Sequence, residues 1–184
     1  MKNPLNIVII FLLIASSVSA QRYITKNGYI RFFSSTPVED IKAHNRQVKA
    51  ALNSETGELV FKVLMKSFSF KKALMQEHFN EKFVESHKYP TSTFKGKILN
   101  PGQINYDKNG EYPVTVKGKL TIHGVTQEIK EEGALTVKGD EVRAQTEFMV
   151  AVADYDIDIP ATVRDNIAKK VKVTVDCTLQ KYKK

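Results

Sequence analysis

The sequence predicts an all-β fold, a meander or barrel of about eight strands with one amphipathic helix and one short helix. Apolar and polar residues alternate along most of the chain, and this alternation is the period of a strand with one buried face. Short turn-forming stretches separate the alternating segments, as they do in meanders and barrels. Cys177 is the single cysteine, so no internal disulfide can form and stability must come from packing.

The first twenty residues have the three-part pattern of a secretory signal peptide. Lys2 supplies a positive start, residues 7–15 are an unbroken apolar run, and residues 18–20 form a small-residue cleavage site. The apolar run is about half as long as a membrane span requires, which disfavours a membrane anchor. We therefore expect residues 1–20 to be cleaved off, residues 21–184 to form one domain, and the protein to be periplasmic or secreted.

The net charge of the whole chain is +8, and its positive residues are scattered. Adjacent lysines form only short doublets such as Lys71-Lys72, and no dense basic block is interleaved with aromatic residues. This distribution argues against a nucleic-acid partner. It is compatible with weak contact to an anionic membrane surface. Association into a homodimer is left open by the sequence.

The alternating segments follow one another with turn signals between them. Residues 53–57 and 138–140 contain glycine and predict hairpin connections. Asn109-Gly110 suits a turn that requires positive φ. The predicted strands are residues 29–34, 47–52, 58–68, 93–99, 104–106, 112–122, 126–137, 141–153 and 170–182.

The predicted strand 112–122 shows the alternation most clearly. Val114, Val116, Leu120 and Ile122 point to one side, and the residues between them are threonine, lysine and glycine. One face of this strand should therefore be buried and the other exposed to water.

Residues 72–85 have the spacing of a helix rather than a strand. An apolar stripe and an acidic stripe each recur every four residues and are offset by two positions, which is about 200° on a helix. We expect an amphipathic helix laid over the core, with the acidic stripe as a solvated face. The apolar stripe is Met75, Phe79 and Phe83, and the acidic stripe is Glu77, Glu81 and Glu85. A second, short helix is predicted at residues 161–168, after Pro160.

No motif predicts a metal site, a cofactor or a catalytic centre. His78 and His87 are nine positions apart, which would turn them to opposite sides of a helix, and no histidine–cysteine cluster occurs. The aspartates of residues 154–165 match part of a calcium loop, but Ile159 and Asp165 stand where that loop needs glycine and glutamate. Cys177 shares a strand face with valines and is interpreted as a small buried hydrophobe.

Four segments, taken together, carry a family resemblance. They are EHFNEKFVESHKYPTSTFKG at residues 77–96, GKLTIHGVTQ at 118–127, FMVAVADYDIDIP at 148–160 and VKVTVDCTL at 171–179. With these segments the chain resembles the YceI-like family of exported lipid-binding proteins. The resemblance implies an extended antiparallel β-barrel, lipocalin-like in outline, that holds long-chain amphiphiles, notably polyisoprenoids such as those of quinone metabolism.

The chain departs from the commonest family pattern near its start. Residues 35–47 are longer and more polar than a tight turn, and we interpret them as a loop at the mouth of the barrel.

The first functional hypothesis is a carrier without catalytic residues, whose partner is a long-chain isoprenoid or other lipid. A barrel of about eight strands is wide enough for side chains or for one slim ligand. The candidate lining residues share an apolar signature that is common to cores and cavities. They are Phe32, Phe61, Phe68, Phe79, Phe83, Phe94, Leu120, Ile122 and Phe148.

Two further hypotheses belong to other classes of protein. The first is a filled barrel without ligand that acts as a stress or interaction protein. The second is a lipid-modifying enzyme, for which His123 and His78 are the only faint candidates.

Overall fold

The computed structural model describes residues 21–183. The predicted signal peptide, residues 1–20, lies outside this range, so its cleavage stays a prediction. Among the residues described, no helix is both long enough and apolar enough to cross a membrane.

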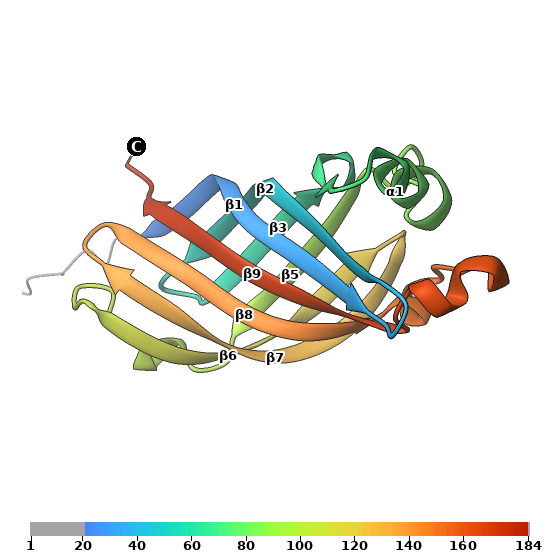
Figure 1. Ribbon diagram of the computed structural model, residues 1–184. Coiled ribbons are helices and arrows are strands. Elements are labelled where there is room, and N and C mark those ends of the chain that lie inside the picture. Colours follow the sequence, from blue (N-terminus) through green and yellow to red (C-terminus); the bar gives the residue numbers. More distant parts are fainter. Residues whose placement is uncertain (1–20, 184) are drawn as a thin grey trace, which may run out of the picture.

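Eight strands form a closed antiparallel barrel, which confirms the predicted fold class (Figure 1). Neighbours around the barrel follow the order β1-β9-β8-β7-β6-β5-β3-β2, and pairing of β1 with β2 closes it. A two-residue strand, β4 (Ser69–Phe70), adds to the edge of β2. The barrel strands are β1 (Arg22–Ser35), β2 (Asp40–Asn53), β3 (Glu58–Leu64), β5 (Thr91–Ile98), β6 (Gly110–Ile122), β7 (Val125–Lys138), β8 (Glu141–Ala151) and β9 (Lys170–Lys181).

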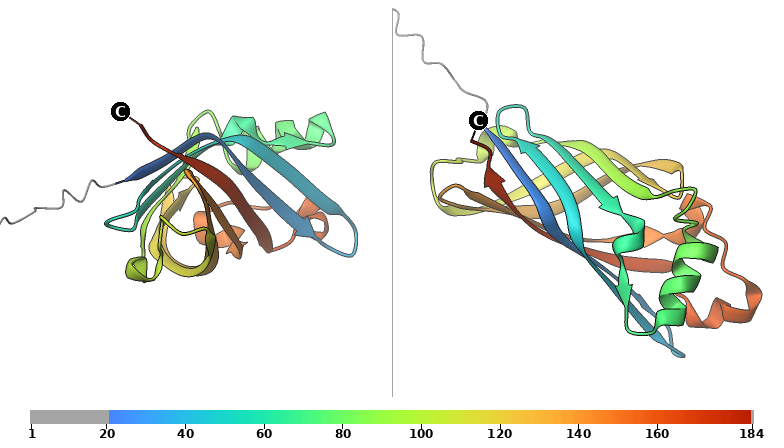
Figure 2. Two further views of the ribbon diagram at one scale, coloured as in Figure 1. Left: turned by 90° about the vertical axis from the view of Figure 1, so that its left-hand side faces the viewer. Right: turned by 90° about the horizontal axis from the view of Figure 1, so that it is seen from above.

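Most of the helical segments gather at one end of the barrel (Figure 2). Helix α1 (Ala73–His78) continues directly into a π-helical turn at Phe79–Phe83, so the predicted amphipathic helix is present. Two short 3-10 helices, Val152–Tyr155 and Ala161–Asn166, lie at the same end, and the second is the predicted short helix. We call this end the mouth. Both ends of the described chain lie at the opposite end of the barrel.

The alternation predicted for β6 is confirmed. Val114 and Leu120 are buried, Val116 and Ile122 are partly buried, and all four face the interior.

The prediction of a polar loop at residues 35–47 is wrong. Strand β2 already begins at Asp40, and only residues 36–39 form a turn. The inward face of this part of β2 carries Ala43 and Asn45, both fully buried, and Asn45 donates a hydrogen bond to the Leu64 carbonyl at 2.9 Å. Because the inward residues here are a small alanine and a polar asparagine, the segment lacks the alternation of large apolar and polar residues that predicts a strand.

The prediction of a strand at residues 104–106 is also wrong. A 3-10 turn, Pro101–Gln103, precedes an irregular segment in which Ile104 is buried. Tyr106 stacks on Tyr23 with 5.6 Å between ring centroids. These rings pack at the end of the barrel away from the mouth, so the apolar residues of this segment close the barrel instead of extending its wall.

The structure also differs from the turn predicted at Asn109-Gly110. Gly110 is the first residue of β6 and has no positive φ. The glycines with positive φ are Gly57, Gly124 and Gly139, and the first and last of these lie in the two predicted hairpin connections.

A glycine pair brings β5 and β6 close together inside the barrel. Gly96 and Gly118 are register partners on the inner face. A Cβ on Gly118 would lie 2.4 Å from the Lys95 carbonyl oxygen and 2.5 Å from the Cα of Gly96. A Cβ on Gly96 would meet the tip of the Phe94 ring at 2.6 Å. The pair therefore leaves room for this ring inside the barrel.

Gly118→Ala is expected to lower the free energy of unfolding by about 1–3 kcal/mol, because the added methyl group meets backbone that cannot move aside cheaply. Urea denaturation measures the change. Gly102→Ala is the control, since a Cβ there has nothing within 4 Å, and its effect should stay within about 0.5 kcal/mol. Equal effects of the two substitutions would contradict the close approach.

Candidate ligand-binding cavity

The barrel encloses an apolar cavity of about 430 Å³. Its wall includes residues from all eight barrel strands, from α1 and its π-helical turn, and from the segment 152–167. Pockets for small molecules typically measure about 300–1,000 Å³ and are mostly apolar. The cavity therefore has the size and character of a site for an apolar ligand.

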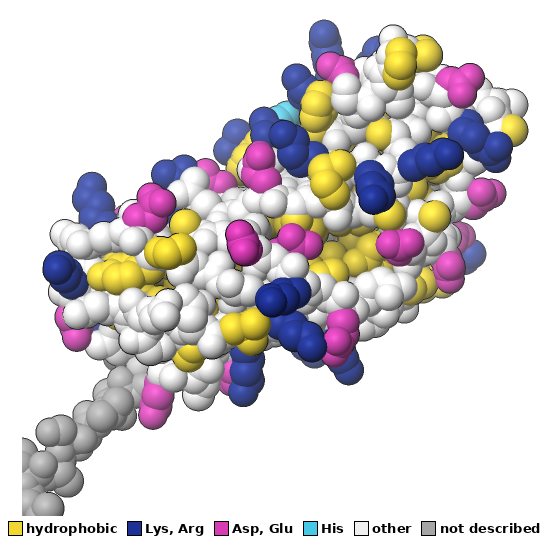
Figure 3. Space-filling view, turned by 90° about the horizontal axis from the view of Figure 1, so that it is seen from below, with side chains coloured by type: hydrophobic (Ala, Val, Ile, Leu, Met, Phe, Trp, Pro, Cys, Tyr) yellow, Lys and Arg dark blue, Asp and Glu magenta, His cyan; other side chains and the backbone are white. Residues whose placement is uncertain are grey.

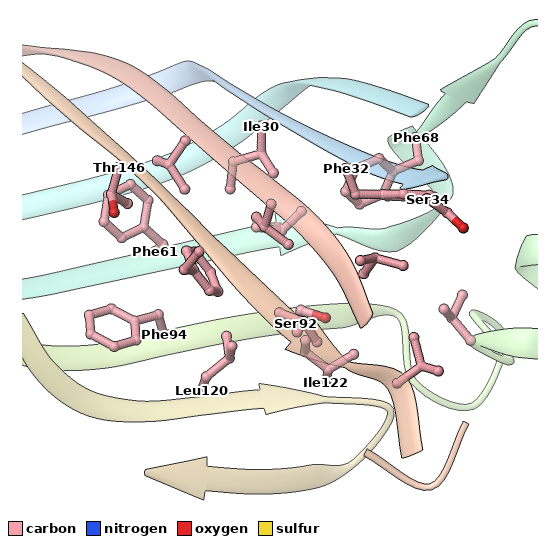
Figure 4. Close-up of a pocket in the computed structure, with 18 of the residues that line it drawn as sticks. Ile30, Phe32, Ser34, Phe61, Phe68, Ser92, Phe94, Leu120, Ile122 and Thr146 are labelled. Carbon is pink, nitrogen blue, oxygen red and sulfur yellow. The ribbon is translucent and has the colours of Figure 1, made fainter. Parts of the chain in front are cut away.

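All nine residues predicted from the sequence lie in the wall of this cavity: Phe32, Phe61, Phe68, Phe79, Phe83, Phe94, Leu120, Ile122 and Phe148. Figure 4 shows Phe61, Phe94 and Leu120 projecting from three neighbouring strands into the same space. The structure places these side chains together. That a ligand touches them stays a prediction.

Sequence reasoning missed two parts of the wall. One is the inner face of β9, whose Val171, Val173 and Val175 line the cavity. Their alternation was visible, but it was interpreted only as a buried strand face. The other is the segment after β8, where Ile157 and Ile159 face the cavity. In this segment the isoleucines alternate with aspartates, and this alternation was the sequence signal that the isoleucines face inward.

An aromatic cluster packs the helix against the mouth of the barrel. The Phe79 ring lies 5.4 Å from Phe32, 5.6 Å from Phe68 and 5.1 Å from Phe70, measured between ring centroids. Met75 and Phe83, the other members of the predicted apolar stripe, also line the cavity. The apolar side of the helix thus forms part of the cavity wall.

Polar contacts tie the elements of the mouth together. Glu39, in the β1–β2 turn, accepts hydrogen bonds from Lys72 at 2.9 Å and from Asn166 at 3.3 Å. The bond from Lys72 is the main reason that the pKa of Glu39 lies below its usual value. Ser34 accepts a hydrogen bond from the amide of Ala168 at 2.8 Å. These bonds connect three segments that are far apart in the sequence.

A second polar contact joins the segment after the helix to the β6–β7 turn. His123 and Gly124 both have positive φ and form the two-residue turn between these strands. The His123 ring contacts the Glu85 carboxylate at 3.1 Å and the Tyr155 carbonyl at 3.1 Å. Glu85 also has positive φ, an unfavourable conformation for a residue with a side chain. Glu77 and Glu81 are exposed as predicted, whereas Glu85 serves this contact.

Glu85→Gln is expected to flatten the acid limb of the pH–stability profile. Hydrogen bonds from Lys88 and then from His123 hold the pKa of Glu85 below its usual value. A depressed carboxyl pKa stabilises the fold above the unfolded-state value of about 4.3, and this contribution is lost as pH falls through the folded-state value. Urea midpoints between about pH 2 and pH 7 measure the effect. Glu81→Gln, on the exposed side of the helix, should retain the wild-type slope, and equal slopes in all three proteins would contradict the prediction.

Of the remaining titratable candidates, Cys177 and His123 lie outside the cavity wall and His78 lies in it. Cys177 is fully buried, as predicted, and burial raises its pKa to about 12, so its thiol stays protonated. His78 lies at the mouth and His123 is held by Glu85. Within residues 21–183, no group of three or more histidine, cysteine, aspartate or glutamate residues is arranged to hold a metal ion.

Comparisons with known proteins agree with this architecture. The sequence profile of the YceI-like domain matches residues 23–179. Among curated protein sequences, none matches the chain significantly.

Solved structures of similar fold include three bacterial proteins. A polyisoprenoid binding domain from Saccharophagus degradans, implicated in plant cell wall breakdown, has a TM-score of 0.77 at 14% identity, over 89% of this chain and 100% of that chain. BcnA of Burkholderia cenocepacia has a TM-score of 0.68 at 13% identity, over 82% and 95% of the two chains. A YceI protein of Campylobacter jejuni has a TM-score of 0.58 at 14% identity, over 77% and 85%. At these identities the likeness shows the fold.

Proposed function

The chain belongs to the YceI-like domain family, and from this premise we propose that the protein is a binding protein that holds one long-chain amphiphile, such as a polyisoprenoid, inside its barrel. The observation that carries the proposal is the apolar cavity of about 430 Å³, whose wall draws on every barrel strand. A similar structure from Saccharophagus degradans is described as a polyisoprenoid binding domain, which supports the same class of ligand. The cavity favours a carrier over a filled barrel.

The apolar tail of the ligand supplies most of the affinity in this proposal. Burial of each CH₂ group contributes roughly 0.8 kcal/mol, so a few five-carbon units contribute on the order of 10 kcal/mol before ordering costs. An exposed charge pair contributes about 0–1 kcal/mol. Polar groups therefore select and orient the head of the ligand. The protein holds its ligand for transport, storage or sequestration and performs no reaction on it.

Native mass spectrometry followed by organic extraction tests the proposal. The purified protein should carry a stoichiometric long-chain adduct. Protein refolded from denaturant should lose this adduct and regain it on incubation with a polyprenyl lipid. A refolded protein whose mass stays unchanged with polyprenyl and fatty chains would overturn the proposal and favour a filled barrel.

We further infer that the protein is exported and loads its ligand at an anionic membrane surface through the mouth. Val38 in the β1–β2 turn and Leu74 on α1 are 63% and 60% exposed. The ion pair between Glu39 and Lys72 holds these two segments together, and Lys71 adds positive charge beside them. Two exposed aliphatic side chains with neighbouring lysines suit an anionic lipid surface.

The double substitution Val38→Ser and Leu74→Ser is expected to weaken binding to anionic vesicles by about tenfold, because two aliphatic side chains no longer enter the lipid. Co-sedimentation with phosphatidylglycerol vesicles measures the binding. Leu99 is 53% exposed at the far end of the barrel, so Leu99→Ser serves as the control and should bind as the wild type does. Equal losses in both variants would contradict docking through the mouth.

A further inference from the structure

The wall of the barrel has a lateral opening between β7 and β8. These strands pair only between Ala134–Lys138 and Glu141–Gln145, as far as the described chain shows. Along nearly their whole lengths β7 stays paired with β6 and β8 stays paired with β9, so the two strands diverge from each other without losing their outer neighbours. Ile129 and Glu131 on β7, and Phe148 and Val150 on β8, line the cavity on the two sides of the gap. We call this gap the window.

Hydrogen bonds mark both ends of the window. At one end the Thr146 hydroxyl donates to the Glu132 carbonyl at 2.6 Å. At the other end the Gln127 amide donates to the Asp154 carbonyl at 2.8 Å. Figure 3 shows a hollow on this side of the molecule, in which apolar side chains are visible between charged ones. The window therefore connects the apolar interior with solvent at the side of the barrel.

Glu131 is the carboxylate at the inner edge of this window. The alternation of β7 turns Ile129, Glu131 and Leu135 to the inside, and Glu131 lies in the cavity wall. Within residues 21–183 its carboxylate makes no ion pair and no side-chain hydrogen bond. Burial raises the pKa of Glu131. Burial is also the main reason that the pKa of Tyr155 is raised, and the negative charges of Asp154 and Glu131 raise it further.

A carboxylate in this position loses part of its hydration, which an apolar residue would not lose. Transfer of a polar group to an apolar surrounding is unfavourable unless a hydrogen-bond partner compensates it. A perturbed carboxyl group in a cleft is a common mark of a functional site. The ligand of the cavity can supply the missing partner, because its polar end must lie where the cavity meets water.

The charge around the window restricts the chemistry of that polar end. Among the described residues no lysine or arginine lines the cavity, so a phosphate or diphosphate at Glu131 would meet a carboxylate without a cation beside it in the wall. A hydroxyl group carries no charge, and it can donate a hydrogen bond to the carboxylate or accept one from the protonated acid.

We propose that Glu131 binds the hydroxyl group of an uncharged amphiphile at the window, so that the protein prefers a long-chain alcohol or phenol over the same chain bearing a diphosphate. This proposal rests on the proposed function and adds to it a head-group class and a specificity residue. The tail of the ligand lies in the cavity, and its polar end reaches water between β7 and β8.

Competition binding with a polyprenol and a polyprenyl diphosphate of equal length tests the proposal. The refolded wild-type protein should prefer the alcohol by about tenfold or more. Glu131→Gln should weaken alcohol binding, strengthen diphosphate binding and bring the two affinities close together. Glu132→Gln removes the same charge from the neighbouring outward-facing position, and it should retain the wild-type preference.

Two results would overturn the proposal. One is equal affinity of the wild type for the two chains. The other is the same change of preference in both variants, because that would reflect net charge and not a contact with Glu131. If neither chain binds to the wild type, the proposed function itself fails, and this outcome is distinct from binding without preference.

Discussion

Replacement of Ala144 by phenylalanine is expected to weaken binding of a long prenyl chain about fiftyfold while the barrel stays folded. Ala144 lies on β8, is 6% exposed and faces the cavity between Leu135 and Cys177 on the adjacent strands. A ring at this position enters the space that the tail of the ligand would fill. If it displaces about three CH₂ groups, at roughly 0.8 kcal/mol each, the loss is about 2.4 kcal/mol.

The same substitution separates the carrier from a filled barrel. In a filled barrel a new ring must displace packed side chains, which typically costs about 1–3 kcal/mol of stability. In a carrier the cavity receives the ring, so the free energy of unfolding of the unliganded protein should change little or rise. Urea denaturation and calorimetric titration with a polyprenol measure the two quantities on one preparation.

Ala51→Phe is the matched control for Ala144→Phe. Ala51 is an exposed alanine on β2, in a strand paired on both sides, so it offers the same change of volume outside the cavity. It should leave both affinity and stability close to the wild type. Loss of stability in Ala144→Phe without loss of affinity would contradict the carrier.

The apolar face of each strand was the part of the molecule that could be predicted from the sequence. The nine predicted wall residues lie at one cavity because strand alternation and helical spacing together determine which side of an element is apolar. Alternation does not distinguish a wall that is packed from a wall that surrounds empty space. The existence of the cavity therefore required the structure.

Polar residues on the inner face were harder to predict. Asn45 is buried inside β2, and its partner, the Leu64 carbonyl, belongs to another strand. Glu131 was passed over because glutamate in a strand usually points to water. Both assignments depend on which strands are neighbours and where their pairing stops. The pairing of β7 with β8 ends at Ala134 and Gln145. Nothing in the sequence around these residues indicates this end, so the window could not be predicted.

The helix at the mouth also shows a limit of sequence patterns. The stripe of Met75, Phe79 and Phe83 predicted the inward face correctly. It did not predict that the helix changes to π-helical bonding at Phe79, nor that Glu85 leaves the helix to meet His123. The position of Glu85 depends on its contact with His123 in the β6–β7 turn, which is far from it in the sequence.

Phe79→Ala is expected to cost about 3 kcal/mol and to speed the release of bound ligand. The Phe79 ring is partly buried and contacts three other rings at centroid distances of 5.1–5.6 Å. Its removal loses apolar burial, for which Phe→Ala typically costs about 3–5 kcal/mol, and the low end applies to a ring that is only partly buried. Because no residue of α1 itself is buried, the loss should appear as local opening of residues 73–84.

Hydrogen exchange of residues 73–84 and the dissociation rate of a bound polyprenol should both rise in Phe79→Ala. Leu74→Ala is the control, because Leu74 is on the same helix and is 60% exposed, so its effect should stay within about 0.5 kcal/mol. Faster exchange together with faster release identifies the helix as a lid over the mouth. Faster exchange with an unchanged rate of release would instead direct the ligand through the window between β7 and β8, since that is the other route from the cavity to water seen in the described chain.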